Sequence, residues 1–362
     1  MTYRRRVRRL VLLLVAVGLV LTAPSASARP VERTPAEENP LAGYPWGVYT
    51  GTGELSWAPY ARASGRTKEL LGAIALRPKA KWFGAWIPDD QIARKVREYV
   101  ANATGGDPDV LVQLTVFRMV PWEKQACRRL PTAAEEASYL RWIKRFARAL
   151  GTTRAAIVVQ PDGPFAMCAP GGSTRLSELV ALATRRLAAL PNTTVYVEAG
   201  SASWSRYDPA RAAELLVRGG VADARGFHLG TTHYESVDDL VRYGAQVVDA
   251  LAARGLPGKR FTVDTAENGR PFTYAEHVAR YPARTFNNAP TCRTTTQTRC
   301  VTLGIPPTTE VADPRWGLPA DVAALASSYV DAYLWAGRPW LRFQSDPFDR
   351  KRALAVARTT PY

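Results

Sequence analysis

The chain has 362 residues, of which 46% are hydrophobic, and a formal net charge of +16 at pH 7. A chain of this length and composition can bury a large core as one α/β domain. The positive charge raises the question of a nucleic-acid partner. However, the arginines are scattered through amphipathic stretches, and no basic region, zinc finger or aromatic platform surrounds them. We therefore expect an arginine-rich surface and no nucleic-acid partner.

The first 28 residues have the pattern of a secretory signal peptide. Five arginines within residues 4–9 precede an apolar run at residues 10–21, and Ala26-Ser27-Ala28 offers small residues for cleavage. Residues 29–38 are polar and contain proline, which predicts a short leader. No other run is long and apolar enough to cross a membrane. We expect a secreted protein without membrane association after signal removal, exported by the general or the twin-arginine route.

Short apolar runs and longer amphipathic runs alternate through residues 39–362, the predicted single domain. Strands are predicted at residues 81–86, 110–117, 155–160, 194–198, 226–229, 260–264 and 340–344. Helices are predicted at residues 91–103, 133–150, 176–190, 209–217, 236–253 and 320–336. This alternation predicts right-handed βαβ units and a seven-stranded parallel barrel or barrel-like open sheet. Residues 265–318 interrupt it with a long loop, and such insertions are usually functional.

Carboxylates follow several predicted strands: Asp162, Glu198, Asp264 and Asp346. The carboxyl ends of parallel strands are where α/β folds place their chemistry, and a glycosidase needs a protonated acid and a second carboxylate there. Asp162 is the first candidate, because it directly follows a buried apolar run. Its Pro-Asp-Gly-Pro context is equally consistent with an ordinary turn.

Nine tryptophans lie in predicted loops or at strand ends, where indole rings could stack on sugar faces. Most tryptophans in any protein are core residues, so we expect only two or three to contact a ligand. Competing chemistries lack their motifs: the sequence contains no Gly-x-Ser-x-Gly, Walker or His-Glu-x-x-His pattern. Among the three histidines, His233 is the least typical of a purely structural residue. Four cysteines in an exported chain predict two disulfides, and their spacing does not favour zinc.

Six motifs occur in order along the chain. They are Asn-Pro-Leu-Ala-Gly-Tyr-Pro-Trp at 39–46, Lys-Trp-Phe-Gly-Ala-Trp at 81–86, Gln-Pro-Asp at 160–162, Glu-Ala-Gly-Ser-Ala-Ser-Trp at 198–204, Val-Asp-Thr-Ala-Glu-Asn-Gly at 263–269 and Leu-Gly-Ile-Pro-Pro-Thr-Thr at 303–309. Together they resemble the landmarks of glycoside hydrolase family 6, which holds inverting cellobiohydrolases and endoglucanases. The resemblance implies a distorted seven-stranded parallel α/β barrel, hydrolysis of β-1,4-glucan with inversion, and no metal or organic cofactor.

The resemblance also implies roles for individual residues. Asp162 matches the family's proton donor, and Asp346 matches the aspartate proposed as base or charge partner. The residues expected to bind substrate are Trp46, Trp204, Glu198, Asp264, Asn268 and Arg342. The disulfides expected from the family are Cys127 with Cys168, which would bridge two active-site loops, and Cys292 with Cys300, which would close a small local loop.

The chain departs from the family's pattern at three acids. Ala126 stands where the family has the aspartate that keeps the donor protonated and helps relay the proton of the attacking water. Gln160 and Gln344 replace two glutamates. Glu123, three residues before Ala126, is a candidate compensating acid. Fewer like charges beside Asp162 would weaken it as a general acid.

We therefore expect a secreted, monomeric β-1,4-glucan hydrolase. Two alternatives stay open. The chain could be a non-catalytic glucan-binding protein that has lost the water-activating carboxylate, or its altered middle motifs could select a different glycan. The sequence also leaves open whether attack on a chain is internal or processive.

Overall fold

The computed structural model describes residues 39–362, apart from the side chains of Glu123 and Lys124. The predicted signal peptide and leader, residues 1–38, lie outside the described residues. The strands are β1 Lys81–Gly84, β2 Val112–Phe117, β3 Ala155–Val159, β4 Thr193–Glu198, β5 Gly226–Leu229, β6 Arg260–Asp264, β7 Val330–Leu334, β8 Leu341–Arg342 and β9 Ser345–Phe348. The α-helices are α1 Trp57–Ala61, α2 Gly65–Ala75, α3 Ile92–Thr104, α4 Glu123–Ala126, α5 Ala133–Leu150, α6 Arg175–Ala188, α7 Pro209–Arg218, α8 Val237–Ala252, α9 Tyr274–Arg280, α10 Ala320–Tyr329 and α11 Arg350–Thr359.

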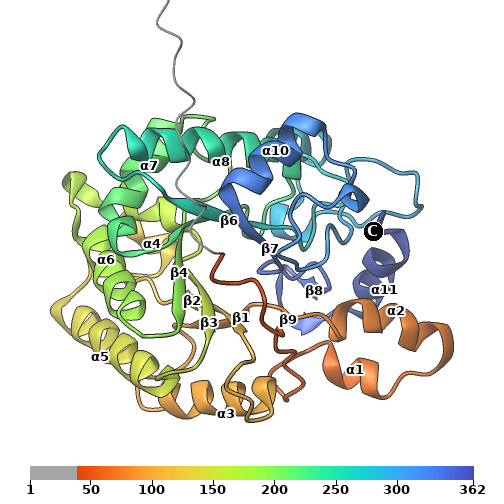
Figure 1. The fold of residues 1–362 in the computed structure, drawn as a ribbon, viewed down its shortest axis with the longest axis horizontal. Helices are drawn as coiled ribbons and strands as arrows, with labels where there is room; N and C mark the ends of the chain where they lie inside the picture. Colours follow the sequence, from red (N-terminus) through yellow and green to blue (C-terminus); the bar gives the residue numbers. More distant parts are fainter. Residues whose placement is uncertain (1–38) are drawn as a thin grey trace, which may run out of the picture. The chain divides into compact units, whose positions relative to one another are not determined.

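Seven parallel strands form one curled sheet in the order β1 to β7, so each strand pairs with the next one in the sequence (Figure 1). The predicted α/β fold, a distorted seven-stranded parallel barrel, is confirmed. The edge strands β1 and β7 do not pair with each other within the described residues. One backbone hydrogen bond, from the Ala80 amide to the Trp335 carbonyl (2.9 Å), crosses the gap between them, which we call the seam.

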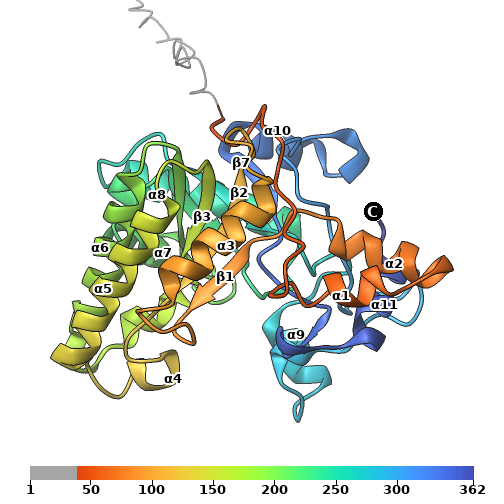
Figure 2. The same ribbon diagram turned by 90° about the horizontal axis from the view of Figure 1, so that it is seen from below.

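Alternate side chains of each strand pack on opposite faces of the sheet. Val112, Leu114 and Val116 of β2 pack outward against the helices, including the predicted apolar stripe of α5. Ala156 and Val158 of β3 face the other way, into the interior of the barrel. Figure 2 shows α5 to α8 on one side of the strands, with α1, α2 and α11 grouped beyond the other edge.

The structure corrects two predictions near the carboxyl terminus. The helix predicted at residues 320–336 ends at Tyr329, and the chain continues directly into β7, which supplies the parallel partner that β6 requires. Residues 340–344 are not the seventh sheet strand. They enter the antiparallel β8–β9 hairpin, which turns at Phe343 and Gln344, both in the left-handed region (φ 53° and 61°).

A second core lies beside the seam. It joins Leu71 of α2, Val356 of α11, and Trp335 and Trp340 from the segment after β7 with apolar side chains of residues 265–318. The long predicted loop is therefore a structural wall that packs against α2 and α11.

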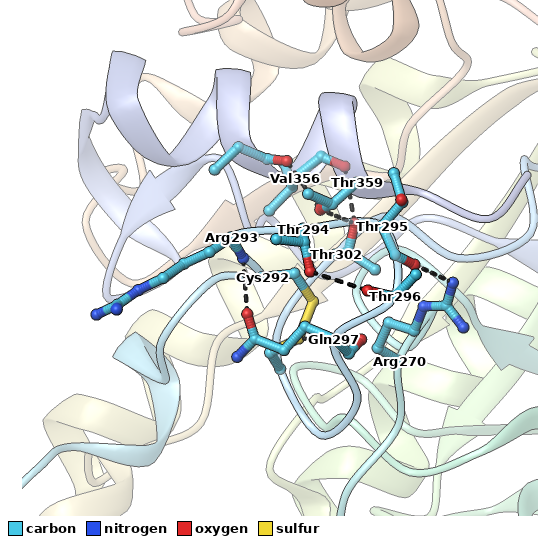
Figure 3. Close-up of a disulfide and its surroundings, with 12 residues drawn as sticks. Arg270, Cys292, Arg293, Thr294, Thr295, Thr296, Gln297, Thr302, Val356 and Thr359 are labelled. Atoms are coloured by element: carbon cyan, nitrogen blue, oxygen red, sulfur yellow. Dashed lines mark hydrogen bonds between the residues drawn. A yellow bond between two sulfur atoms is a disulfide. The ribbon is translucent and has the colours of Figure 1, made fainter.

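Figure 3 shows how the outer part of this wall is tied down. The Cys292–Cys300 disulfide closes a small loop, and Arg270 donates a hydrogen bond to the Thr295 carbonyl. Just after the loop, the Thr302 hydroxyl donates to the Val356 carbonyl of α11 (2.9 Å). Both predicted cysteine pairs are bonded in the structure.

Residues 39–362 cluster into one compact unit. Across this range, none of the helices combines the length and the apolar composition that a membrane crossing requires.

Replacing Phe146 with alanine should lower the free energy of unfolding by about 3–5 kcal/mol. Its ring is fully buried, stacks on Trp142 and meets Phe83 edge to face. Urea denaturation followed by tryptophan fluorescence measures the change. Leu140→Ala on the same helix, where the side chain is 42% exposed, is the matched control and should change stability by about 0.5 kcal/mol at most. Equal losses in both variants would contradict the assigned core face of α5.

Candidate active site

A cleft of about 500 Å³ opens along the seam. Its walls come from four segments: residues 49–55, the start of β1, the residues after β7, and the β8–β9 hairpin. We call it the seam cleft. Its volume lies within the range of small-molecule sites, and its lining mixes aromatic rings with charged groups. The residues that line it are Tyr49, Gly53, Glu54, Leu55, Lys79, Ala80, Lys81, Trp82, Trp86, Trp335, Arg338, Trp340, Leu341, Ser345 and Asp346.

A smaller hollow of about 190 Å³ lies at the carboxyl ends of β3 and β4. Trp204, Phe165 and the Cys127–Cys168 disulfide line it. The Trp204 ring is half-buried, meets Phe165 edge to face and is covered in part by the tilted ring of His233. His233 thus packs on Trp204, which the sequence predicts to bind substrate. The His233 Nδ1 lies 2.9 Å from the Thr231 carbonyl.

Asp162 lies three residues beyond the end of β3, is half-buried and directly precedes the 3-10 helix Gly163–Cys168. Both interpretations of this segment are therefore partly right, since a buried strand ends and a turn follows it. Asp162 and Gln160 have positive φ values, 60° and 58°. Non-glycine residues in this region are strained and tend to cluster at functional sites. Thr232, Phe343 and Gln344 share the feature on neighbouring loops.

The α4 loop packs directly on the segment that Asp162 begins. Cys127 is bonded to Cys168, and Ala126 is fully buried among apolar side chains, including Ala166 and Leu176. A carboxylate at position 126 would be buried in this apolar cluster unless the loop moved. Glu123, the candidate compensating acid, is the first residue of α4, and its side chain lies outside the described residues.

Glu198 is buried at the end of β4, with 1% of its surface exposed. Its carboxyl accepts hydrogen bonds from the Thr231 hydroxyl (2.6 Å) and the Gly200 amide (3.1 Å). Burial, followed by the nearby charges of Asp264 and Asp162, raises its pKa well above the usual range. His228 Nε2 lies 3.9 Å away, and burial lowers the pKa of that imidazole to about 3. The imidazole is therefore neutral at neutral pH, and the raised pKa of Glu198 favours its protonated form.

Asp264 and Glu267 are two further buried acids, and their carboxyls interact with each other. Four backbone amides, including those of Ala336 and Gly337 after β7, donate to Asp264. Burial raises the pKa of both carboxyls, and the mutual repulsion raises that of Glu267 further. The Gln344 amide donates to Glu267 Oε1 (2.9 Å), while Glu267 Oε2 has no partner among the described groups.

The cations of the seam cleft were not singled out by the sequence. Arg338 lies over the Trp82 ring, 4.3 Å from its centroid, and Lys81 donates to the Gly53 carbonyl (2.6 Å). Burial lowers the pKa of both side chains, to about 10 for Arg338. Recognising β7 in the sequence would have placed Arg338 just beyond a strand end, where functional side chains are expected.

The predicted site residues are only partly brought together. Asp162 follows β3, while Glu198 and Asp264 are the last residues of β4 and β6, and the charges of Asp162 and Asp264 both act on Glu198. Asp346 is exposed at the seam cleft. The Asn268 amide instead donates to the Glu235 carbonyl (2.9 Å), which is a structural contact.

Two of the predicted substrate-binding residues lie elsewhere. Trp46 packs against apolar side chains of the barrel interior, and its indole donates a hydrogen bond to the Leu41 carbonyl. Its backbone forms an isolated parallel β-bridge with Leu111, directly before β2. Arg342 is exposed on β8 and is not part of the cleft lining. In residues 39–362, no group of three or more candidate ligand side chains is arranged to hold a metal ion.

A family model described as glycosyl hydrolases family 6 matches residues 54–339. The chain belongs to this family. Endoglucanase 1 of Streptomyces halstedii is 31% identical to this family 6 chain over 222 residues, which cover 59% of this chain and 65% of that protein. Endoglucanase A of Cellulomonas fimi is 26% identical over 223 residues, covering 62% of this chain and 47% of that protein. The chain thus spans between about half and two thirds of the length of these two relatives.

Solved structures of family 6 proteins have the same fold. An endoglucanase from Mycobacterium tuberculosis superimposes with a TM-score of 0.68 at 24% identity, covering 88% of this chain and 98% of that one. The catalytic core of a Chaetomium thermophilum cellobiohydrolase gives 0.63 at 18% identity, covering 90% and 99%. At these identities the likeness establishes the barrel and not the substrate.

Glu198→Gln should make stability less sensitive to pH. Because the folded pKa of Glu198 is raised, folding retains a proton that the unfolded chain releases, so its contribution is present below the unfolded pKa and is lost as pH rises towards the folded pKa. Between pH 5 and pH 8 the wild type should therefore lose more unfolding free energy than the variant. A proton held only in the folded state lowers that free energy by about 1.4 kcal/mol for each pH increment of one.

Urea denaturation at the two pH values measures this difference. Glu310→Gln, at an exposed position, is the control and should follow the wild-type profile. Parallel profiles for Glu198→Gln and the wild type would contradict a neutral Glu198 in the folded state.

Proposed function

We propose that this chain is a secreted, monomeric hydrolase of β-1,4-glucan that works with inversion and uses Asp162 as the proton donor. In this proposal residues 1–28 are the signal peptide, residues 29–38 a leader and residues 39–362 the catalytic domain. Support comes from membership of family 6, from relatives named as endoglucanases, and from the Mycobacterium tuberculosis endoglucanase, which was solved with a thio-linked cellobioside. The observation that carries the proposal is an acid beyond the end of β3, in a strained turn, that acts electrostatically on Glu198.

In the proposed reaction, Asp162 donates its proton to the glycosidic oxygen as the bond to the anomeric carbon breaks. Water attacks that carbon from the opposite face, and the proton that the water loses goes to a carboxylate. Asp346, exposed at the seam cleft, is the described candidate for this base, and Glu123 is the second. Trp86, 54% exposed in the cleft, and Trp204 would hold neighbouring sugars by stacking.

A second candidate function is binding of glucan without hydrolysis. The observation that favours it is Ala126, which is fully buried in an apolar cluster at the position where the family has its water-activating acid. A protein of this kind would keep the aromatic cleft and bind oligosaccharides without turnover.

Asp162→Asn should reduce hydrolysis of cellohexaose by about 100-fold or more, because an amide cannot donate the proton that the leaving oxygen needs. Proton NMR of the fresh products measures both rate and stereochemistry. Inversion at a β-linkage predicts the α-anomer at the newly formed reducing end. Calorimetry should find oligosaccharide binding retained in the variant.

The matched control is Asp249→Asn on the exposed side of α8, which should leave turnover unchanged. If Asp162→Asn hydrolyses as fast as the wild type, the donor is a different group. If the wild type binds cellohexaose but releases no product at any pH between 4 and 9, the binding protein is the correct description.

A further inference from the structure

Arg338 is a cation of the seam cleft that forms no direct ion pair with the described carboxylates, although nearby Glu54, Asp346, Glu267 and Asp264 raise its pKa against the effect of burial. Within the described residues, its guanidinium forms no ion pair and no hydrogen bond, and its Nε is buried without a partner. The guanidinium lies against the face of Trp82, 4.3 Å from the ring centroid. A guanidinium presents a planar fork of donors that matches a carboxylate, and leaving such a group unpaired in a partly buried site is costly. The arrangement therefore indicates a ligand that places a hydrogen-bond acceptor beside Arg338.

Two of the other charged groups around the cleft are engaged by hydrogen bonds. Lys79 is held by the Ile74 and Arg77 carbonyls at the end of α2, and Glu54 accepts from the amide and the hydroxyl of Ser56. Lys81 has one hydrogen bond among the described groups, to the Gly53 carbonyl, so its ammonium keeps donors available to the cleft. Asp346 is exposed and lies on the same lining without an ion pair to Lys81 or Arg338.

The neighbouring loops contribute little negative charge. Gln160 and Gln344 are amides at the positions where the family has glutamates. Burial raises the pKa of Glu198 and Glu267, which favours their neutral forms. An anionic ligand entering the cleft would therefore meet two available cations, Arg338 and Lys81, while Glu54 and Asp346 are the acids among the lining residues.

We propose that the seam cleft binds a β-1,4-linked sugar that carries a carboxylate, with Arg338 pairing with that carboxylate and Lys81 supplying a further donor. This rests on the proposed function, because it names the substrate class of the same cleft. Trp86 and Trp82 both pack against Phe117, so the exposed indole and the guanidinium lie on one wall. A sugar stacked on Trp86 could thus direct an acidic substituent towards Arg338.

The carboxylate could belong to C6 of a uronic acid unit or to C1 of an aldonic acid at a chain end. Calorimetry on the Asp162→Asn protein would compare cellotetraose, cellotetraose oxidised at C6, and cellotetraonic acid. We expect one of the two acids to bind at least about tenfold more tightly than the neutral sugar, as a charge-assisted contact would give. The acid that binds more tightly identifies the source.

Arg338→Met in the same background should remove the preference for the acid and change binding of neutral cellotetraose by about threefold or less. Arg338→Lys should keep part of the preference, since it retains the charge but not the fork. Arg145→Met removes an arginine from the exposed side of α5 and should keep the full preference. Tryptophan fluorescence checks that each variant is folded, and Arg338→Lys keeps the test valid if Arg338→Met does not fold.

Equal affinity for all three sugars, or a preference that survives Arg338→Met, would overturn the inference. Hydrolysis of neutral cellohexaose by the wild type is measured in parallel. Turnover without a preference for acids refutes the carboxylate site and leaves the hydrolase standing. If the protein prefers the acids but hydrolyses none of these substrates, the carboxylate site stands and the proposed hydrolase function is refuted.

Discussion

The strands β1 and β7 do not pair with each other, and the gap between them determines where the rest of the site lies. An open edge exposes backbone groups and a gap in the barrel, and within residues 39–362 one backbone hydrogen bond, between Ala80 and Trp335, crosses it. The second core of α2, α11 and residues 265–318 covers the outside of this gap. What remains is a cleft whose walls are far apart in the sequence. A long insertion that looks like a loop is thus needed to complete the barrel.

Burial influences the protonation states of the ionisable groups around the site more than ion pairing does. The carboxyls of Glu198 and Glu267 lie where water cannot stabilise an anion, so their protonated forms are favoured. Burial also lowers the pKa of Arg338, but a value of about 10 leaves the guanidinium charged at neutral pH. The same desolvation therefore favours the neutral form of these acids but leaves the guanidinium charged. Among the residues that line the cleft, three basic side chains (Lys79, Lys81 and Arg338) stand against two acidic ones (Glu54 and Asp346).

Much of the fold could be predicted because its strands are short apolar runs separated by capped amphipathic helices, and six of the seven predicted sheet strands are present. The seventh was misplaced because no glycine or proline separates α10 from β7 within residues 320–334, so the sequence does not show where the helix ends and the strand begins. Because β7 was not recognised, Arg338 was not seen to follow the end of a strand. Trp46 was misassigned for a different reason, since a motif gives residue identity but not whether a ring faces the cleft or the barrel interior.

The amides that replace the family's acids are built into the structure. Gln344 accepts from the Arg338 amide (2.9 Å) and donates to Glu267 (2.9 Å), while Gln160 accepts from the Arg118 amide (3.3 Å) and donates to the Pro161 carbonyl (2.9 Å). A carboxylate at either position could accept but not donate, and it would add charge beside buried acids. The substitutions therefore fit together with the protonated acids and with the unpaired guanidinium. Both amides therefore have a hydrogen-bond donor and a hydrogen-bond acceptor within the described residues, as buried polar side chains require.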